Sequence, residues 1–137
     1  MFQGIFQTTA IPVTEQLAVF SQARHEVLTG NVANIGTPDY QARDLSVDDF
    51  QSKLREALEA RRNRMPGQPP GDAGPPETPR IADATKDPTT ILYHDGSSDG
   101  MEFQVTEMAK NHLQHNVAMS IMGSQFRLLG AAISERV

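Results

Sequence analysis

The stretch LTGNVANIGTPDYQARDL, residues 28–45, decides the fold of this chain of 137 residues. Its first part continues the pattern of an amphipathic helix, which Gly36 and Pro38 then bring to an end. Gly36 can take the left-handed conformation that ends helices, and Pro38 cannot continue one while it biases Thr37 toward extended geometry. Asn34 can bond backbone groups that become free at the helix end. Local chemistry therefore fixes the chain direction here, which favours a joint over a catalytic loop.

Four polar residues of this stretch could do more than end a helix, and they are Asn31, Asn34, Tyr40 and Arg43. On spacing alone, the simplest interpretation is helix termination followed by a surface loop. Specified packing and a ligand site are the alternatives. The residues by themselves do not separate these interpretations.

Upstream of this stretch, an apolar seam predicts a helix from about Val13 to Ile35. The seam alternates steps of four and three residues, which is close to the 3.5-residue period of packed helices. Pro12 suits the first helical turn, and Thr9 or Thr14 could cap it. The helix residues that we expect to pack are Val13, Leu17, Phe20, Val27 and Leu28, and the seam also includes Arg24, Asn31 and Asn34.

Downstream, the sequence DDFQSKLREALEARRNR predicts a short second helix over residues 48–64. Asp48 and Asp49 stand at its start and three arginines at its end, as the helix dipole prefers. This helix is highly charged, so only one of its faces should be buried. That face is formed by Phe50, Leu54, Ala57, Leu58 and Arg61.

A linker follows the second helix. Residues 66–79, PGQPPGDAGPPETP, contain six prolines and three glycines and cannot form a core. The next segment has turn signals and a short apolar run, residues 90–93, which predicts either one edge strand or extended chain. We therefore expect residues 65–100 to be irregular for the most part.

The last segment predicts the longest helix, from Met101 to about Ser134. Its apolar residues occupy most of the circumference near the end, and such a helix belongs inside an assembly or a core. Two helices packed as a hairpin bury only one face of each helix. The apolar surface on their other faces stays exposed, and an exposed apolar area of that size marks an interaction site. The isolated chain should therefore be marginally stable and completed by neighbours. The packing residues that we expect here are Leu113, Val117, Ile121, Phe126, Leu129 and Ile133.

Together these segments predict a mainly α fold with one axial domain. Long N- and C-terminal helices pack as an antiparallel, coiled-coil-like hairpin, accompanied by a short middle helix and an irregular Pro/Gly-rich linker. The predicted segments are an N-terminal axial helix (1–35), a motif loop (36–47), a short helix (48–64), a variable linker (65–100) and a C-terminal axial helix (101–137).

Composition and charge argue against several classes of function. The chain has no cysteine, which removes disulfides and thiolate sites, and its net charge is −5. Most of that excess lies in residues 36–100, which hold 8 basic and 12 acidic side chains, so no segment is basic enough to bind nucleic acid. The first 23 residues contain no Lys or Arg, which argues against a cleaved secretory signal. Polar residues interrupt the most apolar window, residues 117–133, which argues against a membrane span.

Candidate metal and catalytic groups have simpler explanations. His112 and His115 lie at i and i+3 on one helix face, a spacing that can hold a metal, but no second ligand pair accompanies them. The loop DGSSDG, residues 95–100, lacks two of the ligands of an acidic calcium loop. Glu102 and Glu107 suit the helix dipole or a salt bridge, because acid–base chemistry needs a pocket that the sequence does not supply. We expect no metal, cofactor, small-molecule substrate or catalytic residue.

The sequence LTGNVANIGTPDYQARDLSVDDF, residues 28–50, resembles the signature of the axial proteins of the bacterial flagellar rod and hook. In that family a helix ends in an Asn-Ile-Ala-Asn-like motif that is followed by Thr-Pro-Gly-Tyr. The C-terminal sequence TEMAKNHLQHNVAMSIMGSQFRLLGAAI is similar to the terminal helix of the family. Asp39 departs from the pattern, because it stands where glycine is common. The matching residues of the assembly motif are Asn31, Ala33, Asn34, Thr37, Pro38, Tyr40, Ala42 and Arg43.

This resemblance implies a structural subunit of the proximal rod of the flagellar basal body, and no reaction. Such subunits are helical hairpins stacked in a tube that surrounds the export channel and transmits torque. The implied partners are copies of the chain, other rod proteins, the rod-base adaptor, the membrane ring and the flagellar type III export gate. The resemblance places the chain in the rod within the periplasmic space, exported from the cytoplasm without a cleaved signal, and Phe2, Ile5 and Phe6 are candidates for export recognition.

Two other classes remain open from the residues alone. A small secreted or cytosolic helical-hairpin adaptor could bind one partner through the same apolar seams. A metal-dependent enzyme could use His112 and His115. A cooperatively melting monomer would favour the adaptor, and stoichiometric metal would favour the enzyme.

Overall fold

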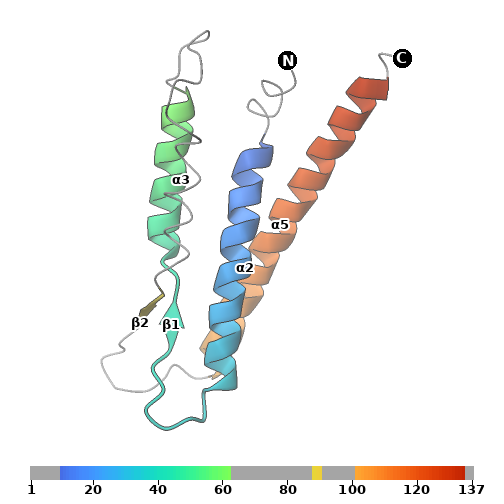
Figure 1. Ribbon diagram of the computed structural model, residues 1–137. Helices are drawn as coiled ribbons and strands as arrows, with labels where there is room; N and C mark the ends of the chain where they lie inside the picture. Colours follow the sequence, from blue (N-terminus) through green and yellow to red (C-terminus); the bar gives the residue numbers. More distant parts are fainter. Residues whose placement is uncertain (1–9, 63–87, 91–100, 135–137) are drawn as a thin grey trace.

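The computed structural model describes residues 10–62, 88–90 and 101–134. These residues form the helices α2 (Ile11–Ala33), α3 (Val47–Arg62) and α5 (Met101–Ser134) and the two-residue strands β1 (Arg43–Asp44) and β2 (Thr89–Thr90). Helices α2 and α5 lie side by side and antiparallel, and α3 runs along the other side of α2 (Figure 1). The mainly α fold with a terminal helix hairpin is confirmed. The strands pair antiparallel, with Arg43 opposite Thr90.

The start of α2 differs in detail from the expectation. Pro12 lies in the first helical turn, as the sequence predicts, but the N-cap is Ala10 and has no side-chain hydrogen bond. The hydroxyl of Thr14 instead lies 3.1 Å from the carbonyl oxygen of Ala10 and 3.0 Å from that of Ile11. Thr14 is therefore not the cap, because its hydroxyl bonds back along the helix. Thr9 lies outside the described residues.

The end of α2 shows which residue carries the left-handed conformation. Asn34 is the C-cap, and its side-chain Nδ2 donates to the carbonyl of Gly30 at 2.8 Å, which confirms its predicted bond to freed backbone groups. Gly36 does not have the positive φ that we expected. That conformation belongs to Asp39, at φ 59°. The N–H of Tyr40 donates to the carbonyl of Thr37 at 3.2 Å, so the chain turns at Pro38 and Asp39.

This turn requires at the position of Asp39 a backbone conformation that favours glycine. A type II turn places proline second and a residue with positive φ third, and glycine adopts that conformation at the lowest cost. Asp39 takes it with a Cβ atom present. Aspartate is among the few residues that tolerate it. Aspartate therefore forms the turn at this position.

The hairpin between α2 and α5 is built on a seam that mixes small, polar and larger apolar residues. In both helices the buried and half-buried positions alternate by three and four residues, as in a coiled coil. Small side chains allow two helix backbones to approach closely. On α2 these positions are Ile11, Thr14, Ala18, Ser21, His25, Leu28 and Val32. On α5 they are Gln104, Met108, Asn111, His115, Ala118, Met122, Gln125 and Leu129.

The expected packing residues of α5 are mostly on faces of the helix that do not meet α2, so their predicted packing is not made within the chain. Leu129 is half-buried on the seam. The other five are exposed, namely Leu113 (65%), Val117 (48%), Ile121 (40%), Phe126 (52%) and Ile133 (61%). The physical reason is that α5 carries apolar residues on all of its sides, so hydrophobicity alone does not determine which face meets α2.

An apolar core lies between α2, α3 and Leu45, the residue after β1. Phe20, Leu45 and Phe50 are at most 2% exposed, and the rings of Phe20 and Phe50 stack with centroids 4.0 Å apart. Leu17 and Val27 pack against this core, as does Leu54. Phe20, Leu17 and Val27, which the sequence singles out for packing, thus face α3 rather than α5. Leu28 is buried and Val13 half-buried.

Helix α3 is oriented by local capping and one apolar face. The Oγ of Ser46 accepts the backbone N–H of Asp49 at 3.1 Å, and Asp48 and Asp49 occupy the first turn as predicted. Phe50 is buried and Leu54 half-buried. Leu58 is 41% exposed, so the buried face ends before it and the expectation for this residue is wrong.

Helix α5 is also long and apolar enough to cross a membrane by length and composition. An 18-residue window within it has a mean hydropathy of 1.2, and 6% of that window is buried. The same test is passed by helices that do not cross membranes, so it carries little weight. On the same helix, Gln104 and Asn111 are buried polar residues that contact α2.

Candidate functional site

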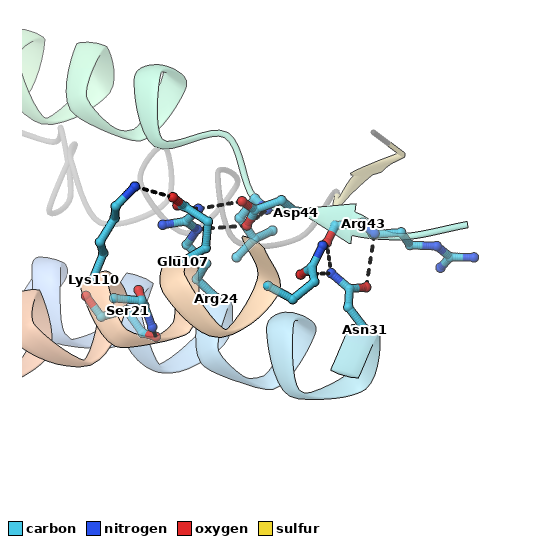
Figure 2. A network of polar contacts seen from close by, with 10 residues as sticks. Ser21, Arg24, Asn31, Arg43, Asp44, Glu107 and Lys110 are labelled. Carbon is cyan, nitrogen blue, oxygen red and sulfur yellow. Dashed lines mark hydrogen bonds and ion pairs between the residues drawn. The ribbon is translucent and has the colours of Figure 1, made fainter. Parts of the chain in front are cut away.

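Asn31, near the end of α2, uses its whole side-chain amide in hydrogen bonds. Its Nδ2 donates to the carbonyl of Arg43 at 2.6 Å and to Oε1 of Gln104 at 3.2 Å (Figure 2). Its Oδ1 accepts the backbone N–H of Arg43 at 3.1 Å and the hydroxyl of Tyr40 at 3.0 Å. An amide offers two donor hydrogens and two acceptor lone pairs, so this side chain, in a residue 2% exposed, is fully satisfied.

These bonds fix β1 against the hairpin. Because Asn31 binds both the N–H and the carbonyl of Arg43, its amide replaces a neighbouring strand for that residue. The bond to Gln104 brings α5 into the same contact, 73 residues farther along the chain. Asn31 therefore joins α2, β1 and α5 at one point.

Arg24, two turns earlier on α2, joins the same three segments through charge. Its Nε donates to Oδ1 of Asp44 at 2.8 Å and its Nη2 to Oδ2, which makes a bidentate pair (Figure 2). Its Nη2 also contacts Oε2 of Glu107 at 2.9 Å. The Arg24, Asp44 and Glu107 side chains are 6%, 16% and 15% exposed. Lys110 contacts Oε1 of Glu107 at 2.6 Å from the solvent side. We call Asn31, Arg24 and their partners the polar joint.

The charges of the polar joint stabilise one another. The hydrogen bond to Asp44 raises the pKa of Arg24 above its ordinary value, although burial acts in the opposite direction. The hydrogen bond from Lys110 lowers the pKa of Glu107, and Arg24 acts in the same direction against burial. Both groups are therefore charged at neutral pH. Loss of one partner would leave a largely buried charge uncompensated, which is strongly destabilising.

The middle of the hairpin seam holds a second polar contact, between Ser21 and Asn111. The Nδ2 of Asn111 donates to the carbonyl of Ser21 at 2.7 Å, and both residues are at most 1% exposed. Among the described residues, Ser21 Oγ and Asn111 Oδ1 have no hydrogen-bond partner. Buried polar groups of this kind lower stability, while a buried asparagine can fix the register of two helices. We infer that these buried polar groups favour one register of α2 against α5 and lower the stability of the hairpin.

Comparison with known proteins identifies relatives that span most of this chain. The chain is 31% identical over 112 residues to the flagellar basal body rod protein FlgB of Salmonella typhimurium strain LT2, which covers 76% of this chain and 78% of the relative. It is 30% identical over 113 residues to the same protein of Escherichia coli K12, with the same coverage. FlgB of Cereibacter sphaeroides strain ATCC 17023 is 31% identical over 121 residues, with coverage of 88% and 91%.

The chain belongs to the FlgB family of flagellar basal body rod proteins. The resemblance to flagellar axial proteins that its sequence motifs carry is thereby confirmed. As an FlgB-family protein, it is a structural subunit of the flagellar basal body rod. No protein-family model matches its sequence.

The structure brings together part of the FlgB-family motif that the sequence singled out. Asn31, Tyr40 and Arg43 meet in the polar joint. Ala42, next to them, is buried at 8% exposure. Asn34 is half-buried and caps α2. Four motif residues are exposed, namely Ala33, Thr37, Pro38 and Arg43, and Arg43 enters the polar joint through its backbone N–H and carbonyl.

Sequence reasoning missed the roles of Arg24, Asp44, Gln104 and Asn111. One signal could have found Arg24, because an arginine inside an apolar seam predicts a buried ion pair. Its partners lie 20 and 83 residues away, where spacing gives no information. The suggestion that Glu107 is salt-bridged is confirmed.

The remaining candidates of the sequence lie elsewhere. His112 is exposed and His115 half-buried on α5. The described part of the chain contains no group of three or more His, Cys, Asp or Glu side chains that could hold a metal ion. The proposed export residues Phe2, Ile5 and Phe6 and the loop at residues 95–100 lie outside the described residues.

Proposed function

We propose that this FlgB-family chain polymerises through its terminal helices into the tubular proximal rod, which surrounds the export channel and transmits torque. The observation that carries the proposal is the apolar surface of α5, where Leu113, Val117 and Leu128 are 65%, 48% and 64% exposed. An exposed apolar area of this kind marks a protein interface, and the partner helices that cover it would come from other subunits.

The polar joint supports a mechanical role in the same proposal. A rod under torque needs its outer parts connected rigidly to its helices. Asn31 and Arg24 bind β1 directly, and β1 leads three residues later into α3. Load on α3 would therefore pass into α2 and α5 through buried hydrogen bonds and ion pairs.

The proposed partners follow from this position in the rod. They are copies of this chain, other rod proteins, the rod-base adaptor, the membrane ring and the flagellar type III export gate. The proposed location is the rod within the periplasmic space, reached from the cytoplasm without a cleaved signal. Phe2, Ile5 and Phe6 are proposed for export recognition, and no catalysis, cofactor, nucleic acid or small-molecule substrate is part of the proposal.

The experiment that tests this function is complementation of a strain that lacks this chain. The wild-type chain should restore rods in isolated basal bodies and swimming in soft agar. Asn31→Asp should be exported but should fail to build rods, because it loses both donors to Arg43 and Gln104 and buries a charge. Ser52→Ala, an exposed position on α3, is the matched control and should swim normally. Normal rods without this chain would overturn the proposal.

A further inference from the structure

Helix α5 has a second face, which points away from α2. We call Leu113, Val117, Ile121 and Leu128 the outer stripe of α5. These residues recur every four or seven positions, so they lie on one side of the helix. At about 100° per residue, Leu113 falls opposite the buried Gln104. Within the outer stripe the exposed fractions range from 40% to 65%.

The exposed charges beside the outer stripe have one sign. Beyond Glu107, which is half-buried and paired, the exposed charged side chains among the described residues of α5 are Glu102 in the first turn, Lys110 and Arg127. Glu102 lies eleven residues before Leu113, and along the part of α5 that carries the outer stripe, residues 110–134, the exposed charges are the two cations. Lys110 is 63% exposed and gives Glu107 one contact, although an ammonium group has three donors. The outer stripe is therefore apolar with a cationic border.

Helix α2 also has an outer face, and its charge is opposite. The residues Glu15, Val19, Gln22, Glu26, Thr29 and Ala33 alternate by four and three positions, and all six are exposed. Val19 is 53% exposed. The exposed charged residues of α2 are the two glutamates, because Arg24 is buried in the polar joint.

We propose that the outer stripe of α5 binds the outer face of α2 of a second copy of this chain, an inference that rests on the proposed function. This contact places cations opposite carboxylates and covers apolar surface on both helices. Pairing α5 with α5 would bring Lys110 and Arg127 toward like charges, and pairing α2 with α2 would do the same for the glutamates. Charge complementarity therefore selects one arrangement.

The contact joins two different surfaces, so it is heterologous and adds copies in sequence instead of closing a two-fold dimer. At the antiparallel register that places Asn31 beside Gln104 within the chain, α2 of the second copy would bring Glu26 beside Lys110. The same register would bring Val19 beside Val117. These two pairs define the geometry of the proposed interface.

The absence of cysteine from the chain allows a direct test by disulfide trapping. Val19→Cys and Val117→Cys are made as separate full-length variants with different tags, mixed and oxidised. Both positions are exposed, so folding should be retained, and equal helix content by circular dichroism checks this. We expect Val19–Val117 cross-links to exceed either homodimer several-fold. Gln51→Cys, an exposed position on α3, replaces Val19→Cys as the matched control and should give only background.

A charge reversal sharpens the test. Glu26→Lys should reduce the Val19–Val117 cross-link, and adding Lys110→Glu in the other variant should restore it. Predominant Val117–Val117 dimers, or cross-links no more frequent than with Gln51→Cys, would overturn the proposal.

The two proposals fail separately when both variants are expressed together in cells. Rods that contain both variants but no Val19–Val117 cross-link would overturn this interface and leave the proposed function standing. Failure of the unmodified chain to enter rods would overturn the proposed function itself.

Discussion

Nη2 of Arg24 lies 2.9 Å from Oε2 of Glu107, although 83 residues separate them in sequence. The same guanidinium makes a bidentate pair with Asp44, 20 residues away. One side chain on α2 thus connects the strand that leads to α3 with the start of the C-terminal helix. The polar joint therefore fixes β1 against both helices of the hairpin.

Removal of Arg24 should destabilise the chain strongly. Arg24→Met leaves the carboxylates of Asp44 and Glu107 largely buried without their partner, and we expect the free energy of unfolding to fall by about 3 kcal/mol. Urea unfolding followed by circular dichroism measures it. Lys53→Met is the control, because Lys53 pairs with Asp49 on the surface and should contribute less than about 0.5 kcal/mol. Equal losses in the two variants would contradict the role of the polar joint.

Removal of the Ser21 hydroxyl should stabilise the hairpin. Ser21 is 0% exposed and its Oγ has no hydrogen-bond partner among the described residues, so Ser21→Ala should raise the free energy of unfolding by about 1 kcal/mol. Ser52→Ala provides the comparison, because the exposed Ser52 hydroxyl donates to the carbonyl of Asp49 and its loss should change little. A clear loss of stability in Ser21→Ala would show that the hydroxyl is satisfied.

The turn at Asp39 offers a test of backbone strain. Its φ of 59° favours glycine. Asp39→Gly should therefore leave the free energy of unfolding, measured with urea, unchanged or raise it by up to about 1 kcal/mol. Asp39→Val should lower stability by at least about 1 kcal/mol, because a β-branched side chain resists this conformation. Asp39→Asn should resemble the wild type. If valine were tolerated as well as asparagine, the left-handed turn would be wrong.

Acid should weaken the fold through Glu107. The pKa of its carboxyl is lowered in the folded chain, so its ionised form contributes stability above the unfolded pKa, about 4.3, and that stability is lost as the pH falls through the lower folded value. The urea concentration at the unfolding midpoint should therefore decrease when the pH is lowered below this value. Glu107→Gln should reduce the pH dependence in that window, and an unchanged dependence would rule out this assignment.

The sequence predicted the helices well because their signals are local. Pro12 marks the first turn of α2, Asn34 caps its end, and Asp48 and Asp49 lie in the first turn of α3. These effects act within one or two turns of a helix, so spacing and residue type were sufficient. The sequence also singled out Asn31, Tyr40 and Arg43, although the bonds between them were not foreseen.

The faces of α5 were not predictable in the same way. Apolar residues surround this helix, and the face that meets α2 is chosen by Gln104 and Asn111, which bond to Asn31 and to the carbonyl of Ser21. Such bonds depend on a partner 73 or 90 residues away. The left-handed residue was misplaced for a related reason, because both Gly36 and Asp39 can adopt positive φ and the neighbouring chain decides which one does.

A density map of the assembled rod at side-chain resolution tests the central claim most directly. The claim is that this FlgB-family chain is a rod subunit whose polar joint persists in the assembly while its α5 surface is covered by neighbours. The map should show Asn31 bonded to Arg43 and Gln104, Arg24 between Asp44 and Glu107, and Leu113 and Val117 buried against another subunit. A rod in which Asn31 and Arg24 have lost these partners, or in which the outer stripe of α5 faces open solvent, would contradict it.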